Sequence, residues 1–194
     1  MFDLRPNSFR RPGGVDQREP LRRLGRAVQV NLPHATEKLR RFLLEAVRGT
    51  APGRALPELR ATVEIDAGIF EVLAVIRDVP RQTEWMADCE ESRPLREEGP
   101  DVSLRYNRTG APWPVSDRDV VLRAETILLE PSAHASVRFA NVADPSAPPI
   151  DGIVRMPRLV GAYDLVALSR ARTRVTYELD IDPDTVTRLA RQVR

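Results

Sequence analysis

The chain has 194 residues, of which 42% are hydrophobic and 30% charged, an ordinary balance for one globular domain with its own core. Its formal net charge at pH 7 is only +2, and acidic residues are interspersed among the basic ones, so we expect no nucleic-acid partner. The single cysteine, Cys89, excludes an internal disulfide and a thiolate metal cage, and the two histidines lie far apart in the sequence. We therefore expect neither a metal nor a cofactor.

No apolar run reaches the 18 residues that a membrane-spanning helix needs. The first residues are rich in arginine and lack the continuous apolar stretch of a secretory signal. These two observations predict a soluble, cytoplasmic protein.

The chain is expected to divide into three parts. Residues 1–20 are rich in Arg, Pro and Gly without periodicity, which predicts a disordered or loosely attached arm. Residues 21–52 form an N-terminal helical segment, with a helix over Thr36–Val47 that Thr36 caps and Gly49 ends. Residues 53–194 are expected to form the main domain.

This main domain is expected to begin with a strand and a helix. Alternating apolar residues predict the strand over Leu59–Ile65. Asp66 is then expected to cap a helix that Pro80 ends. The apolar positions that predict this helix recur at i, i+4 and i+7: Ile69, Leu73 and Ile76.

The rest of the chain alternates with the period of β-structure. The expected strands are Val102–Tyr106, Val120–Leu129, Ser136–Val142, Ile153–Met156, Ala162–Leu168 and Arg174–Ile181. Short connections favour antiparallel pairing, and the fourth and fifth of these strands are expected to pair with each other. A short helix after Pro183 is expected to cover the apolar face of the sheet, which makes the fold class α+β.

Several segments resemble the StAR-related lipid transfer (START) family in their order and spacing. They are PGRALPELRATVEID (52–66), IFEVLAVIRDVPRQTEWM (69–86), PWPVSDRD (112–119), GIVRMPRL (152–159) and TRVTYELDIDP (173–183). The resemblance implies a helix-grip fold, in which a curved antiparallel sheet grips a C-terminal helix around a lipid-sized tunnel. The chain departs from the family pattern in its first 48 residues and in its closing helix, since residues 184–194 span only about 16 Å.

The resemblance implies a lipid-binding or lipid-transfer domain that holds a sterol, phospholipid or fatty acid in an internal cavity, with transient membrane contact. Two alternatives remain open: an enzyme of the polyketide cyclase/aromatase kind that uses the same cavity, and a non-binding remnant or interaction module. No catalytic acid, base or nucleophile stands out in the sequence. Convergence of two or more of Arg105, Tyr106, Arg123 and Glu125 inside the cavity would favour the enzyme.

The residues expected to line the cavity combine the apolar positions of these strands with a few polar groups. They are Arg105, Tyr106, Trp113, Val121, Arg123, Met156, Tyr163, Val175, Tyr177 and Leu179. For Trp113 we favour a buried plug beneath its loop over a place at the tunnel mouth. For Arg105 and Arg123 the solvent face of the sheet is favoured over the cavity, where a guanidinium would bind a headgroup.

Overall fold

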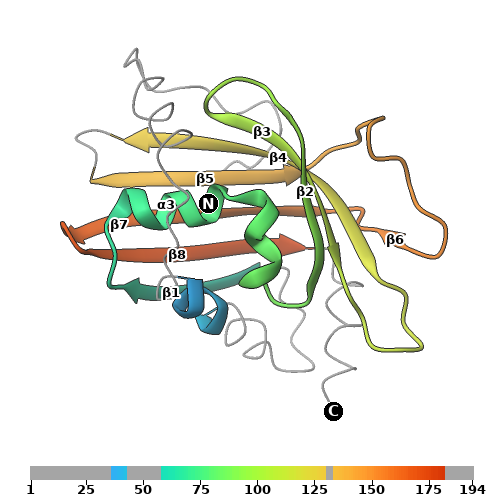
Figure 1. Cartoon of the computed structure of the whole chain (residues 1–194), viewed down its shortest axis with the longest axis horizontal. Coiled ribbons are helices and arrows are strands. Elements are labelled where there is room, and N and C mark those ends of the chain that lie inside the picture. The colour runs from blue at the N-terminus through green and yellow to red at the C-terminus, as the bar shows by residue number, and fades with distance from the viewer. Residues whose placement is uncertain (1–35, 43–57, 130–132, 182–194) are drawn as a thin grey trace.

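The computed structural model describes residues 36–42, 58–129 and 133–181. A curved sheet of eight strands dominates them, in the order β1-β8-β7-β5-β4-β3-β2, with β6 added beside β4 (Figure 1). The strands are β1 (Glu58–Ile65), β2 (Cys89–Glu97), β3 (Val102–Thr109), β4 (Arg118–Leu129), β5 (His134–Asn141), β6 (Val154–Arg155), β7 (Leu159–Ser169) and β8 (Arg172–Ile181). The neighbours along this order pair antiparallel, which confirms the predicted sheet.

The predicted pairing of the short strand β6 with β7 is wrong. Instead, β6 runs parallel to the start of β4, where Arg118 is in register with Val154. The backbone N–H of Val154 donates to the carbonyl of Asp117 at 2.9 Å, and that of Met156 donates to the carbonyl of Asp119 at 2.8 Å. β7 pairs with β5 and β8 instead, because its longer alternating pattern fits two full-length neighbours.

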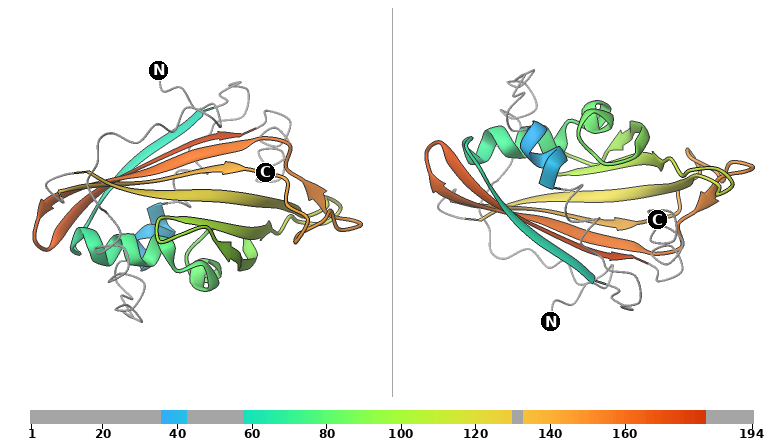
Figure 2. Two further views of the ribbon diagram at one scale, coloured as in Figure 1. Left: turned by 90° about the horizontal axis from the view of Figure 1, so that it is seen from above. Right: turned by 90° about the horizontal axis from the view of Figure 1, so that it is seen from below.

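All helical elements of the described residues lie on one face of the sheet, which we call the inner face (Figure 2). They are the helical residues 36–42, the helix α3 (Ile69–Arg77) and the 3-10 helix η1 (Val79–Glu84). Gly68, not Asp66, stands at the N-cap of α3, and the Glu71 carboxylate accepts the Gly68 N–H at 2.6 Å. The predicted cap is wrong because α3 begins only at Ile69, and the Asp66 carboxylate instead accepts a hydrogen bond from Lys38 at 2.7 Å.

Helix α3 crosses only one end of the inner face. At its start, the Thr173 hydroxyl donates to the Ala67 carbonyl beside the β7–β8 turn, at 2.8 Å. At its end, Arg77 donates to the Pro100 carbonyl in the β2–β3 turn, at 2.9 Å. Beneath it, Leu165 and Val175 are fully buried. The apolar stripe of α3 thus completes a core at this end, which we call the α3 end.

The opposite, outer face carries a second small core over β3 and β4. Its buried members are Tyr106, Val121 and Ala147, with Leu95 and Val142 packed against them. Ala147 and Val142 come from the connection between β5 and β6, so this connection covers the outer face there. Because both faces are covered, β4 is buried at five consecutive residues, Arg118–Leu122, instead of at alternate ones.

Strand β2 is the element that sequence patterning missed. Its residues, CEESRPLRE, are mostly charged and include Pro94. It forms one edge of the sheet and shows two register shifts against β3. Charged residues, proline and bulges are typical of an edge strand, because they discourage pairing with another chain.

The predicted arm (1–20), most of the predicted segment 21–52 and the predicted closing helix lie outside the described residues, so the division into these parts stays a prediction. In the described part of the chain, no helix combines the length and apolarity needed to cross a bilayer.

Candidate functional site

Three aromatic rings form a cluster on the inner face, further along the sheet than the α3 end. The ring centroids of Tyr163 and Tyr177 are 4.7 Å apart, and Phe139 lies 5.7 Å from Tyr163 and 6.4 Å from Tyr177. The rings come from β5, β7 and β8, which are neighbours in the sheet. Around them, Leu179 and Met156 are only half-buried. We call this region the far half of the inner face.

Arg105 of β3 lies on this same face. Its register partner is Leu122, a member of the inner core, and side chains of paired residues lie on one face of a sheet. Its Cζ atom lies 5.8 Å from the centroid of the Phe139 ring. The side chain is 3% exposed, so the expectation that Arg105 lies on the solvent face is wrong.

The guanidinium of Arg105 has no hydrogen-bonding partner among the described residues, and its Nε atom is fully buried. Glu97 of β2 attracts both Arg105 and Arg77, but no ion pair within 4.0 Å joins Glu97 to either arginine in the described part of the chain. Burial lowers the pKa of Arg105, whereas Tyr163, Tyr177 and Glu97 partly offset this effect. Buried arginines are normally paired, so this side chain is an exception that needs an explanation.

The hydroxyl of Tyr163 is also buried on this face, where it interacts with the hydroxyl of Tyr177. Burial raises the pKa of Tyr163 well above its usual value, and Tyr177 adds to this rise. Burial likewise raises the pKa of Tyr177. Both phenols are therefore neutral at physiological pH and can donate a hydrogen bond.

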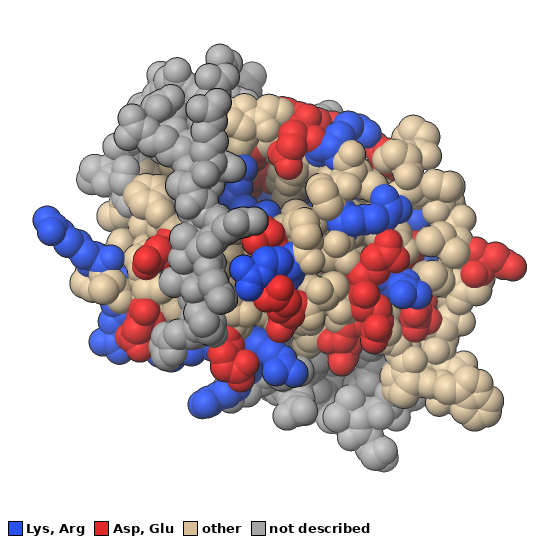
Figure 3. Space-filling model, in the orientation of Figure 1, with Lys and Arg blue, Asp and Glu red and all other residues tan. Residues whose placement is uncertain are grey.

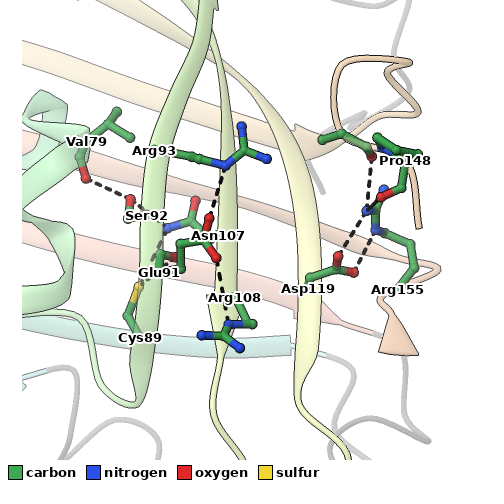
Figure 4. A network of polar contacts seen from close by, with 11 residues as sticks. Val79, Cys89, Glu91, Ser92, Arg93, Asn107, Arg108, Asp119, Pro148 and Arg155 are labelled. Carbon is green, nitrogen blue, oxygen red and sulfur yellow. Dashed lines mark hydrogen bonds and ion pairs between the residues drawn. The ribbon is translucent and has the colours of Figure 1, made fainter. Parts of the chain in front are cut away.

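Two residues further along β3, Asn107 lies on the same face and hydrogen-bonds through its Nδ2, whereas its Oδ1 has no partner among the described residues (Figure 4). Its Nδ2 donates to Gln82 Oε1 at 3.0 Å and to Ser92 Oγ at 3.1 Å. The Ser92 hydroxyl in turn donates to the Val79 carbonyl at 2.7 Å. This network ties β3, β2 and η1 together and is structural.

Tyr106, Val121 and Arg123 do not share the inner face with Arg105. Tyr106 and Val121 are register partners within the outer core. Arg123 is paired in register with Leu104, and its guanidinium binds Glu98 at 3.1 Å near the surface, with Glu125 at 4.0 Å. Of the four polar residues whose convergence would favour an enzyme, only Arg105 points to the inner face.

The motif residues at the start of β4 have a structural role on the outer face. Asp119 is buried, and its two carboxylate oxygens accept hydrogen bonds from Arg155, at 2.7 Å to Nε and 3.0 Å to Nη2 (Figure 4). Arg155 also donates to the Ala147 carbonyl at 3.1 Å. Burial, with Asp119 close by, raises the pKa of Tyr106 to about 12. The ion pair therefore joins two of the segments that suggested the family, PWPVSDRD and GIVRMPRL.

Trp113 is 92% exposed at the tip of the β3–β4 connection, so the expectation of a buried plug is wrong. Its neighbours Pro112 and Pro114 are exposed as well. Trp85, in contrast, is 1% exposed and belongs to the inner core.

Several exposed arginines of this protein form ion pairs with carboxylates, whereas the buried Arg105 forms none among the described residues. Arg81 binds Glu84 at 2.7 Å, and Arg93 binds Glu91 at 3.0 Å. Acidic and basic side chains are intermixed over the visible face of the molecule (Figure 3).

A pocket beside α3 and η1 is lined entirely by described residues. Its volume is about 10 Å³, which holds one water molecule at most. Its lining residues are Thr36, Ala74, Val75, Asp78, Arg81, Glu84 and Trp85. None of these is an expected cavity residue. The roles of Arg105, Met156, Tyr163, Val175, Tyr177 and Leu179 in ligand binding stay predictions, although the structure brings these six residues to one face.

Comparison with known proteins agrees with this architecture. No protein-family model matches the sequence. The uncharacterized protein PA1579 of Pseudomonas aeruginosa is 34% identical over 125 residues, which are 64% of this chain and 60% of the relative's length.

Solved structures extend the comparison. The crystal structure of a STAR-related lipid transfer protein from Xanthomonas axonopodis superposes with a TM-score of 0.60 and 31% identity, covering 69% of this chain and 73% of that one. Human StAR-related lipid transfer protein 5 shares the fold at 17% identity, with a TM-score of 0.56 over 76% of this chain and 80% of that one. On this evidence, the chain belongs to the StAR-related lipid transfer family.

Proposed function

We propose that the protein binds the hydrocarbon part of a lipid on the far half of the inner face. The observation that carries the proposal is the incomplete burial of Tyr177 and Leu179, on the same face as core residues that are fully buried at the α3 end. Large apolar side chains left half-buried on a concave surface are typical of a ligand site.

The energetics of such a site require few special residues. Burying about ten methylene groups contributes roughly 8 kcal/mol, which corresponds to micromolar affinity before entropic losses. Aromatic rings of β5, β7 and β8 supply the wall. Membership in a family with lipid-transfer proteins agrees with this function, and transfer between membranes is part of the proposal.

Native mass spectrometry of the purified protein should show a co-purified lipid, and titration with the uncharged apolar dye Nile red should give saturable binding. Leu179→Gln should weaken the binding of Nile red about tenfold, because the apolar contact of the leucine side chain with the dye is lost. Val166→Gln is the matched control, since Val166 lies on β7 and is already 39% exposed. Equal affinities for both variants, or no binding by the wild type, would contradict the proposal and favour an interaction module.

A further inference from the structure

The two edges of the sheet differ in how well they are protected against pairing with a further strand. Strand β2, at one edge, contains Pro94 and mostly charged residues, and its register against β3 shifts at two places. Strand β1, at the other edge, contains neither proline nor glycine, and it pairs with β8 without a register shift. In the described part of the chain, no strand pairs with the outer edge of β1 (Figure 1). A regular edge of this kind is a template for pairing with another strand.

The charges of β1 make this strand complementary to a second copy of itself. When two β1 strands pair antiparallel with Thr62 opposite its own copy, Arg60 of each lies opposite Glu64 of the other. The twofold symmetry makes this opposite-charge contact twice, and such cross-strand pairs stabilise a sheet. Within one chain, Arg60 binds Glu178 and Glu64 binds Arg174, each at 3.0 Å, which holds both side chains along the edge. A guanidinium and a carboxylate can each take a further partner, and both side chains remain at least partly exposed.

The same register joins the apolar sides of the two sheets. Residues directly opposite each other lie on one face of a sheet, so the inner face of one copy continues into that of the other. Ala61 then lies opposite Val63 of the second copy, and both are only partly buried against the inner core in one chain. A register centred on Ala61 instead would place Glu58 opposite Glu64, a pair of like charges. The charges therefore favour the register centred on Thr62.

We infer that the protein forms a twofold-symmetric dimer in which the β1 strands of two copies pair antiparallel, centred on Thr62, and join the two sheets into one. The strand contact involves only the eight residues of β1 in each copy, so we expect a weak dimer with a Kd on the order of micromolar. The dimer does not depend on the proposed function, because none of the residues to which lipid binding is assigned lies on β1.

Sedimentation equilibrium of the full chain measures the dimer, and charge reversal tests its register. Arg60→Glu and Glu64→Arg each turn two opposite-charge contacts into two like-charge contacts, so each should weaken the dimer at least about tenfold. The double variant Arg60→Glu/Glu64→Arg exchanges the two charges and should restore the dimer. It loses the ion pairs of both residues with β8, so better folding cannot explain the restoration. The matched control is Arg93→Glu, an exposed charge reversal on β2 that should leave the dimer unchanged.

Disulfide cross-linking locates the symmetry axis. Thr62→Cys places two cysteines directly opposite each other, within the range of a disulfide, so mild oxidation should give a covalent dimer. Glu64→Cys is the matched control, because its own copy lies four residues away along the strand, roughly 14 Å, which is too far for a disulfide. The native Cys89 is buried and does not compete.

A protein that stays monomeric up to several hundred micromolar would overturn the inference. A dimer that keeps its Kd in both single charge variants would overturn it as well, because the contact would then lie on another surface. The same holds if Glu64→Cys cross-links and Thr62→Cys does not. None of these results bears on the binding of Nile red, so the proposed function stands or fails separately.

Discussion

Each face of the sheet has a buried charged side chain, and the two side chains differ in their hydrogen-bond partners. On the outer face, Asp119 receives two hydrogen bonds from Arg155, which is itself bonded to a backbone carbonyl. On the inner face, Arg105 has no partner among the described residues. A complete set of partners indicates a structural role, in this case holding the β5–β6 connection against β4. Buried atoms of the core residues Trp85 and Asn107 also lack a partner among the described residues, so Arg105 is distinguished by carrying a full charge without any hydrogen bond there.

The largest expected effect tests whether the inner face is otherwise a packed core. Trp85→Ala should lower the free energy of unfolding by about 3–5 kcal/mol, because it leaves a cavity beneath η1. Trp113→Ala should change it by less than about 0.5 kcal/mol, since Trp113 is exposed. Urea unfolding measures both values. Equal losses would contradict the placement of the two tryptophans.

The second effect tests the outer ion pair. Arg155→Met should lower the free energy of unfolding by about 3 kcal/mol, because it leaves the buried Asp119 carboxylate without its partner. Arg158→Met is the control: Arg158 pairs with Asp180 but is largely exposed, so its loss should cost less than about 1 kcal/mol. If the two variants unfold at the same urea concentration, the Asp119–Arg155 pair does not stabilise the outer face.

A smaller effect on stability is expected at Gly161, against which the Phe139 ring of the aromatic cluster packs. A Cβ atom at Gly161 would lie 2.6 Å from the Phe139 ring and 2.5 Å from the Glu178 carbonyl. Gly161→Ala should therefore lower the free energy of unfolding by about 1–3 kcal/mol and shift the ring of Phe139. Thermal unfolding measures the first, and near-ultraviolet circular dichroism reports the second. Unchanged values would show that the ring does not pack on this backbone.

The smallest expected effect is an increase, not a decrease, in the free energy of unfolding. Arg105→Met should leave the free energy of unfolding of the ligand-free protein unchanged or raise it by about 1 kcal/mol, because it removes an unpaired buried charge. Arg123→Met, which breaks a surface pair, should change it by less than about 1 kcal/mol. A loss of several kcal/mol in Arg105→Met would mean that Arg105 is structural, like Arg155.

Much of the fold could be predicted from the sequence because several elements pack on one side only. In β8, Val175, Tyr177 and Leu179 alternate with polar residues and pack with the inner core, as the period of two predicts. The stripe of Ile69, Leu73 and Ile76 likewise predicted α3 and its buried side. Such patterns record which side of an element faces water.

Sequence patterning could not place the residues of β3 and β4 on the correct face. The apolar residues Val102, Leu104 and Tyr106 suggest an inward face for β3, yet Tyr106 belongs to the outer core and Arg105 to the inner face. The outer core exists only because the β5–β6 connection folds over these strands. A signal was present in the polar residues themselves, since Arg105 and Asn107 interrupt the inner side of an otherwise apolar sheet.

The amino-acid sequence by itself determined most of the strands, the helix α3 and the resemblance to the family, because periodicity and local motifs are properties of neighbouring residues. Tertiary structure decided the partner of Asp119, which is 36 residues away, and the absence of a partner for Arg105 among the described residues. The physical reason is that burial and pairing depend on what lies across the sheet. An arginine that pairs with a carboxylate and one that lacks a partner are identical in the sequence and differ only in their surroundings.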